Sequence, residues 1–272
     1  MASIAPGRIR CARTWPRPRP GLSPRPDLLY CLGLAPEDMQ AVIVAGGRGV
    51  RMRPWSDRIP KVMIPIAGKP LLEHQINWLG KSGIRHVVMC LGYKADCIAE
   101  HFGDGSRWGL RVDYHVEQSP RGTAGCVRDI WPLVTGDALV VYGDIYADFS
   151  LPELLACHRR SGGAATLVLA DTDHPHDSDL VRMEGERITG FCRAAPGEAC
   201  GTLACAAVWV VTGRLMSLVP RDRASDFGRD IFPLALARGE RLTGFVTSEL
   251  VADLGTPERM EAFLKRSRGA QT

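Results

Sequence analysis

The chain alternates between short apolar runs and segments whose apolar residues recur every three or four positions. The runs Gln40–Ala45, His86–Leu91 and Ala138–Tyr142 predict buried strands, whereas the segments 70–81 and 95–102 have the spacing of amphipathic helices. By the same criteria we expect further strands at 111–117, 164–170, 180–183, 203–211 and 242–247, a short apolar strand after residue 61, and helices at 123–134, 151–160, 227–238 and 257–265. Pro132 is expected to disturb the helix at 123–134.

This order of strands and helices predicts an α/β protein with a Rossmann-like, doubly wound and mostly parallel sheet. In sheets of this kind, ligands bind beyond the carboxyl ends of the strands. The glycine-rich loop after Ala45, the acid Glu117 and the dipeptide Gly143-Asp144 all follow predicted strands. We therefore expect these three places to converge on one site.

Residues 1–38 differ in composition from the rest of the chain. They contain seven prolines and six arginines against three acids, which accounts for most of the formal net charge of +4. Such a segment buries too little apolar surface to offset its ordering entropy, and it lacks the continuous apolar core of a secretory signal. We interpret residues 1–38 as a disordered Arg/Pro-rich extension or as a stretch upstream of a natural start at Met39, with a transit-like or binding arm as the alternative. Residues 39–268 are expected to form the folded domain.

The composition as a whole is that of an ordinary globular protein, with 45% apolar and 24% charged residues. No apolar run approaches the length of about eighteen residues that a membrane-spanning helix needs, and the nearly neutral body offers no basic face to a nucleic acid. The nine cysteines are scattered without a C-x-x-C pair, which favours reduced thiols in a cytoplasmic protein over a disulfide framework or a zinc site. We expect neither a membrane nor a nucleic-acid partner. The oligomeric state stays open, a homo-oligomer included.

The stretch 46–49 (GGRG) follows the first predicted strand, where backbone N–H groups can approach and hold phosphate oxygens. A tight turn without a ligand is the plain alternative. Met52 stands where a dinucleotide-binding G-x-G-x-x-G loop needs its third glycine, and no Gly-Lys-Ser/Thr follows to make a P-loop. Arg51 and Lys61 come next in the chain, and cations beside such a loop suit a triphosphate.

An ordered series of motifs over about residues 39–265 resembles the sugar-phosphate nucleotidyltransferase family. The series runs AGGRGVRMRP at 45–54, PKVMIP at 60–65, GKPLLEH at 68–74, GDGS at 103–106, Glu117 with GTAG at 122–125, GD at 143–144, SDFG at 225–228 and DLGTPE at 253–258. Its length and order make it far more specific than any one loop. Within the family it is most similar to the mannose-1-phosphate and D-glycero-D-manno-heptose 1-phosphate guanylyltransferases, and the stretch 174–180 (HPHDSDL) is similar to a loop found there.

The resemblance implies a fold of the nucleotide-diphospho-sugar transferase type, with a nucleotide half at about 39–145 and a sugar half at about 146–268. It also implies a reaction in which the phosphate oxygen of a sugar 1-phosphate attacks the α-phosphorus of a nucleoside triphosphate and pyrophosphate leaves. By the same resemblance, Arg51 and Lys61 are the catalytic cations, and Asp144 and Asp253 hold the implied cofactor, Mg²⁺. The nucleotide would be bound by Ala45, Gly46, Gly47, Gly49, Glu117, Gly122 and Thr123, and the sugar by Asp179 and Arg193.

Three places depart from the family pattern. Val50 stands where the loop usually has Thr, a Glu-Lys pair is missing near Arg193, and Cys205-Ala206-Ala207 replaces an Asn-x-Gly. The last two fall in the sugar half, so they bear on the sugar and on the strength of catalysis rather than on the type of reaction. Two alternatives follow: a catalytically weak, sugar-nucleotide-binding regulatory subunit, and a uridylyl or thymidylyl transferase of the same fold.

Glu117 carries the expectation that the base is guanine. At this position the resembling enzymes for thymidine or uridine nucleotides commonly have Gln, whose amide can both donate and accept toward a pyrimidine. A carboxylate only accepts, and guanine offers two adjacent donors on its Watson–Crick edge. A solvated acid at the end of a strand is the alternative, and the neighbouring Gln118 is a second candidate for reading the base.

Overall fold

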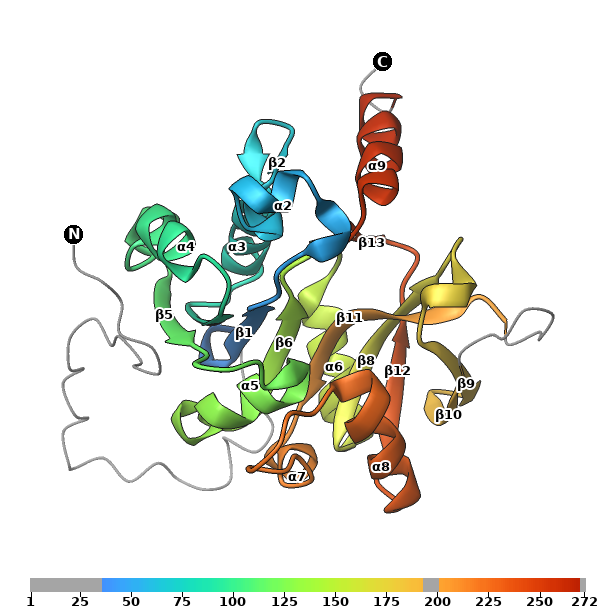
Figure 1. Ribbon diagram of the computed structural model, residues 1–272. Helices are drawn as coiled ribbons and strands as arrows, with labels where there is room; N and C mark the ends of the chain where they lie inside the picture. The colour runs from blue at the N-terminus through green and yellow to red at the C-terminus, as the bar shows by residue number, and fades with distance from the viewer. Residues whose placement is uncertain (1–35, 193–200, 270–272) are drawn as a thin grey trace.

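Within residues 36–192 and 201–269, which the computed structural model describes, nine strands form one central sheet (Figure 1). The strands are β1 (Gln40–Ala45), β4 (His86–Leu91), β5 (Arg111–Val116), β6 (Ala138–Tyr142), β8 (Ala165–Asp171), β9 (Leu180–Glu184), β10 (Arg187–Cys192), β11 (Leu203–Val211) and β12 (Leu242–Val246). Their order across the sheet is β5-β4-β1-β6-β11-β8-β12-β10-β9. Two small sheets accompany it, made by β2 (Pro65–Ile66) with β3 (Lys69–Pro70) and by β7 (Ile145–Asp148) with β13 (Leu250–Asp253).

Helices cover both faces of the sheet. On one face lie α3 (Leu71–Lys81), α4 (Ala95–Phe102) and α6 (Leu151–Ser161), and on the other lie α5 (Gly122–Ile130), α7 (Gly213–Met216) and α8 (Phe232–Ala237). Because successive side chains of a strand point to opposite faces, Ala41 and Ile43 of β1 pack in the first layer and Val42 packs in the second. The predicted α/β class is therefore confirmed. A third, smaller core joins α9 (Pro257–Gly269) to the segment after β1.

The sheet is parallel throughout only in its first half. β1 is parallel to β4 and β6, and β4 is parallel to β5, so these strands end at the same edge. In the second half, β11 is antiparallel to β6, β8 and β9, and β10 is antiparallel to β9 and β12, although β12 is parallel to β8. The β9–β11 pairing closes a ring with β8, β12 and β10. The expected mostly parallel sheet is thus wrong for this half. The two-residue link Gly185-Glu186 between β9 and β10 permits only antiparallel pairing of those two strands.

Prolines and short elements account for three further differences from the sequence pattern. The apolar strand expected after Lys61 is instead a 3₁₀ turn, Lys61–Met63, followed by the two-residue β2. The expected helix at 123–134 ends at Ile130, where a 3₁₀ turn containing Pro132 follows. The expected helix at 227–238 is a π-helical turn, Phe227–Ile231, followed by α8.

The described residues also bear on the membrane and thiol expectations. None of the helices in these residues is long and apolar enough to cross a membrane. The six cysteines that the structure describes are free thiols, and three of them, Cys90, Cys126 and Cys157, are buried.

Candidate active site

A cavity of about 1230 Å³ opens where the strands of the parallel half end. Residues of both halves of the chain line it. Of the catalytic, nucleotide, metal and sugar residues expected from the sequence, those that line the cavity are Ala45, Gly47, Arg51, Lys61, Thr123, Asp144, Asp179 and Asp253. Parallel strand ends meet at one edge, so the expected convergence of the first glycine loop with Asp144 is confirmed.

Asp144 and Asp253 come together through two short strands that the apolar pattern did not predict. β13 pairs with β7 so that Asp253 lies opposite Ile145, and the N–H of Leu254 donates to the carbonyl of Asp144 at 2.9 Å. Gly255 leaves room between the two carboxylates. A Cβ at this position would lie 2.8 Å from Asp253 Oδ1 and 3.1 Å from Asp144 Oδ2.

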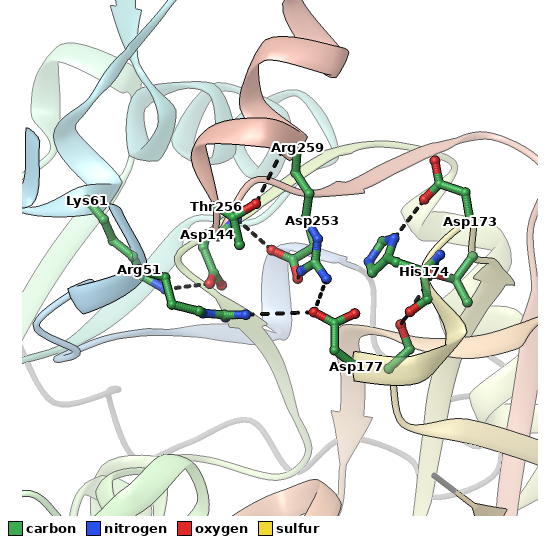
Figure 2. Close-up of polar contacts among 12 residues, drawn as sticks. Arg51, Lys61, Asp144, Asp173, His174, Asp177, Asp253, Thr256 and Arg259 are labelled. Carbon is green, nitrogen blue, oxygen red and sulfur yellow. Dashed lines mark hydrogen bonds and ion pairs between the residues drawn. The ribbon is translucent and has the colours of Figure 1, made fainter. Parts of the chain in front are cut away.

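Each of these two carboxylates has a cationic partner (Figure 2). Lys61 binds Asp144 Oδ2 through its ammonium group, and Arg259 of α9 binds Asp253 Oδ2. Burial and the nearby charge of Asp144 raise the pKa of Asp253, and the charge of Arg259 opposes this shift. Asp253 therefore feels the negative charge of Asp144, while each of the two carboxylates is balanced by its own cation.

The donor set fits Mg²⁺ bound together with phosphate. Among the described residues, no group of three or more His, Cys, Asp or Glu side chains could hold a metal ion by itself. Mg²⁺ is commonly held by only one or two carboxylates, with water and substrate phosphates completing its octahedral shell. Asp144 and Asp253, separated by the space at Gly255, supply this kind of partial shell.

Gln75, which sequence reasoning missed, fixes the turn that carries Asp144. Its side chain is fully buried in α3, and its Nε2 donates to the carbonyls of Tyr142 at 2.7 Å and Ile145 at 2.6 Å. These two carbonyls flank Gly143-Asp144, so one amide group holds both sides of the turn. The available signal was a polar residue on the apolar face of a helix, between Leu72 and Ile76.

Glu117 lies directly beside the glycine loop. A Cβ on Gly46 would come within 2.5 Å of Glu117 Oε2, so only glycine allows this approach. Glu117 Oε1 accepts a hydrogen bond from the N–H of Arg121 at 2.9 Å, just before α5 begins. Burial raises the pKa of Glu117, and the Arg121 N–H opposes that shift. One carboxylate oxygen is therefore engaged by α5, and the other faces the loop.

The remaining predicted nucleotide residues are Gly49, Gly122 and Thr123. Gly49 has a left-handed φ of 62° and packs against the Lys61 side chain. Gly122 packs against the backbone of Ser225. The Thr123 hydroxyl donates to Asp226 Oδ2 at 2.6 Å, which ties α5 to the stretch 225–228.

In the second half of the chain, Asp179 lies against Gly228, where a Cβ would meet its Oδ2 at 2.2 Å. Arg193 lies outside the described residues. Arg259 was not singled out from the sequence, and Asp177 was named only within the stretch 174–180. Arg259 bridges Asp253 and Asp177, and Arg51 Nη1 lies 3.9 Å from Asp177 Oδ2 (Figure 2). Arg259 immediately follows the DLGTPE motif, which was the only signal for it in the sequence.

Comparison of the sequence with known proteins identifies related chains. A family model described as "Nucleotidyl transferase" matches residues 40–267. The mannose-1-phosphate guanylyltransferase of Mycobacterium tuberculosis is 31% identical over 228 residues, which make up 83% of this chain and 63% of that protein. The D-glycero-alpha-D-manno-heptose 1-phosphate guanylyltransferase of Campylobacter jejuni is 38% identical over 116 residues, or 43% of this chain and 52% of that protein. The chain thus spans less than two thirds of the length of these curated relatives.

A solved structure shares the fold. The crystal structure of HddC from Yersinia pseudotuberculosis complexed with GMP-PN superposes with a TM-score of 0.72 at 22% identity, covering 84% of this chain and 99% of that one. At this level of identity the likeness concerns the α/β fold alone.

Proposed function

The chain belongs to the nucleotidyl transferase family, and from this premise we propose that it transfers a nucleotidyl group from a nucleoside triphosphate, GTP in our assignment, to a sugar 1-phosphate of manno configuration, a hexose or a heptose. The products would be a nucleoside diphosphate sugar and pyrophosphate. The family match confirms the resemblance drawn from the motifs. The observation that carries the proposal is the meeting of Lys61, Asp144 and Asp253 at the end of the glycine loop.

In the proposed reaction, the backbone of residues 45–49 cradles the triphosphate, and Thr123 and Glu117 border the nucleoside. Arg51 and Lys61 stabilise the charge that builds on the phosphate oxygens as the sugar phosphate attacks in line. Asp144 and Asp253 would hold Mg²⁺, which when bound neutralises phosphate charge. Asp179 borders the sugar.

We extend the proposal to the organisation of the chain. The parallel order β5-β4-β1-β6 supports assigning a Rossmann-like, doubly wound nucleotide half to about residues 39–145, followed by a sugar half at about 146–268. We further propose a cytoplasmic enzyme that needs neither a nucleic acid nor a membrane as partner. The oligomeric state, which the sequence leaves open, is measured by sedimentation.

The test is pyrophosphate release by the purified full chain in the presence of Mg²⁺. The panel pairs GTP, UTP, dTTP and ATP with the 1-phosphates of mannose, glucose and D-glycero-D-manno-heptose. The proposal expects the fastest turnover with GTP and a manno-configured sugar phosphate. Preference for UTP or dTTP would replace the guanine assignment by the uridylyl or thymidylyl alternative. Binding of sugar nucleotide without turnover for any pair would identify the regulatory subunit instead.

A further inference from the structure

Two guanidinium groups approach one carboxylate oxygen across the cavity. Asp177 Oδ2 binds Nη2 of Arg259 and lies 3.9 Å from Nη1 of Arg51 (Figure 2). The Arg259 side chain is only 15% exposed, whereas that of Asp177 is 49% exposed. Planar guanidinium groups match carboxylate and phosphate oxygens alike. The place that Asp177 Oδ2 occupies is therefore an anion position with a largely buried cation on one side.

The proposed reaction needs two anions in one cavity, a triphosphate and a sugar phosphate. Arg51 and Lys61 follow the glycine loop, so they belong to the triphosphate side. Arg259 approaches from α9, beside Asp253 and facing the sugar-side loop that carries Asp177. Among the described residues that line the cavity, the other cation from this side is the exposed Arg266.

On this basis, and resting on the function proposed above, we propose that Arg259 binds the phosphate group of the sugar 1-phosphate and that Asp177 competes with this phosphate for Arg259. A phosphate dianion that displaces Asp177 leaves the guanidinium paired on both sides, because Asp253 remains its other partner. The exchange therefore never leaves a desolvated cation without an anion.

The packing around Arg259 and Asp177 indicates which of the two residues moves when phosphate binds. Met260 and Phe263, on the same helix as Arg259, are buried in a core with Met52 and Leu71, so α9 holds its position. Asp177 ends a three-residue 3₁₀ turn, Pro175–Asp177, in which no residue is buried. A shift of Asp177 therefore disturbs no buried contact of that turn, whereas a shift of Arg259 would disturb a packed helix.

Variants at both partners test the proposal through effects of opposite sign. Arg259→Gln should raise KM for mannose 1-phosphate by on the order of tenfold or more, with KM for GTP nearly unchanged, and Arg259→Lys should recover part of the loss because it keeps the charge. Asp177→Asn should lower KM for the sugar phosphate, because the competing carboxylate is gone. Lys265→Gln, which removes an exposed cation from the same helix, is the matched control. Circular dichroism establishes that each variant is folded.

A second readout needs no turnover. With EDTA present, mannose 1-phosphate should raise the Tm of the wild type, raise that of Asp177→Asn further, and leave that of Arg259→Gln unchanged. Equal shifts in all three proteins would overturn the role of Arg259, as would an Arg259→Gln enzyme that loses affinity for GTP instead of the sugar phosphate. Absence of turnover in the wild type would defeat the proposed function, while these shifts would still decide the role of Arg259.

Discussion

Lys61 and Asp144 form an ion pair at the end of the glycine loop, with the lysine ammonium bound to Asp144 Oδ2 and the two side chains only 20% and 15% exposed. The lysine comes from the 3₁₀ turn Lys61–Met63, and the aspartate comes from the turn after β6. This pair holds the ammonium group beside a carboxylate assigned to the metal. A cation fixed in this way can meet developing phosphate charge without reorganising.

Loss of this ammonium group should slow turnover more than it weakens nucleotide binding. Lys61→Ala is expected to reduce kcat by on the order of a hundredfold or more, because it removes charge stabilisation that matters most in the transition state. Steady-state kinetics with GTP as the varied substrate measures the split between kcat and KM. Lys69→Ala, which removes an exposed lysine, is the control. A pure rise in KM for GTP would contradict the catalytic assignment of Lys61.

Asp144 and Asp253 should be needed together for dependence on Mg²⁺. Asp144→Asn and Asp253→Asn each keep the size of the side chain and remove one charge, so each should strongly reduce turnover and raise the Mg²⁺ concentration that is required. EDTA should abolish turnover in the wild type. Asp148→Asn, at the exposed end of β7, is the matched control. Full activity in both site variants would remove the pair from the metal site.

The parts of the site that the sequence predicted are those set by the ends of regular strands. Ala45 and Asp144 end or follow long apolar runs, and parallel strands bring their ends to one edge. The Asp144–Asp253 meeting depended instead on β7 and β13, four-residue strands that are too short to show a period. The motif resemblance supplied Asp253, and apolar periodicity alone could not.

The contact between Arg259 and Asp177 could not be predicted from the sequence either. The two residues lie 82 positions apart, and their meeting depends on how α9 packs against the core at Met52 and on the path of an irregular loop. The strand directions in the second half of the sheet were also not predicted, because apolar periodicity carries no information on strand direction. Among the described strands there, only the β9–β10 pair has a link short enough to require antiparallel pairing. The only sign of Gln75 in the sequence was that it is a polar residue on the apolar face of a predicted helix.

Gln75 should matter for both stability and turnover. Gln75→Leu leaves the buried carbonyls of Tyr142 and Ile145 without their donor, which should cost about 1–3 kcal/mol in the free energy of unfolding. The turn would then hold Asp144 less firmly, so kcat should fall in the fraction of protein that remains folded. Urea unfolding and turnover measure the two effects. Asn77→Ala on the same helix is the control, and a loss of stability without a fall in kcat would show that the turn keeps its geometry unaided.

Asp113 should make stability depend on acidity. Burial alone would raise the pKa of Asp113, but a hydrogen bond with His86 at 2.8 Å and the charge of Arg111 together lower it below its usual value. A carboxyl group with a lowered pKa stabilises the fold above its unfolded pKa, and this stability is lost as the pH falls through the folded value. Below about pH 4, the free energy of unfolding measured with urea should therefore fall more steeply with decreasing pH in the wild type than in Asp113→Asn. The exposed Asp222→Asn variant should follow the wild type, and parallel pH profiles for all three proteins would refute the expectation.

The prediction that the base is guanine rests on Glu117. Its Oε2 faces Gly46 and its Oε1 accepts a hydrogen bond from the Arg121 N–H, so the carboxylate is held in one orientation beside the glycine loop. An oriented carboxylate can accept from the ring N1–H and the exocyclic amine of guanine, whereas a pyrimidine with a single ring N–H offers it less. A charge-assisted pair of this kind should supply about 1–3 kcal/mol of discrimination.

Glu117→Gln should therefore lower kcat/KM for GTP relative to UTP and dTTP by on the order of tenfold to a hundredfold, because an amide exchanges one acceptor for a donor that faces the donors of guanine. The same variant keeps an oxygen that can accept from Arg121, so the start of α5 should survive and Tm should change little. Gln118→Glu provides the comparison at the neighbouring position. If the GTP preference is unchanged in Glu117→Gln and lost in Gln118→Glu, then Gln118 reads the base. If neither variant alters the preference, base selection lies with the backbone of the glycine loop, and the resemblance at position 117 reflects only the hydrogen bond to Arg121.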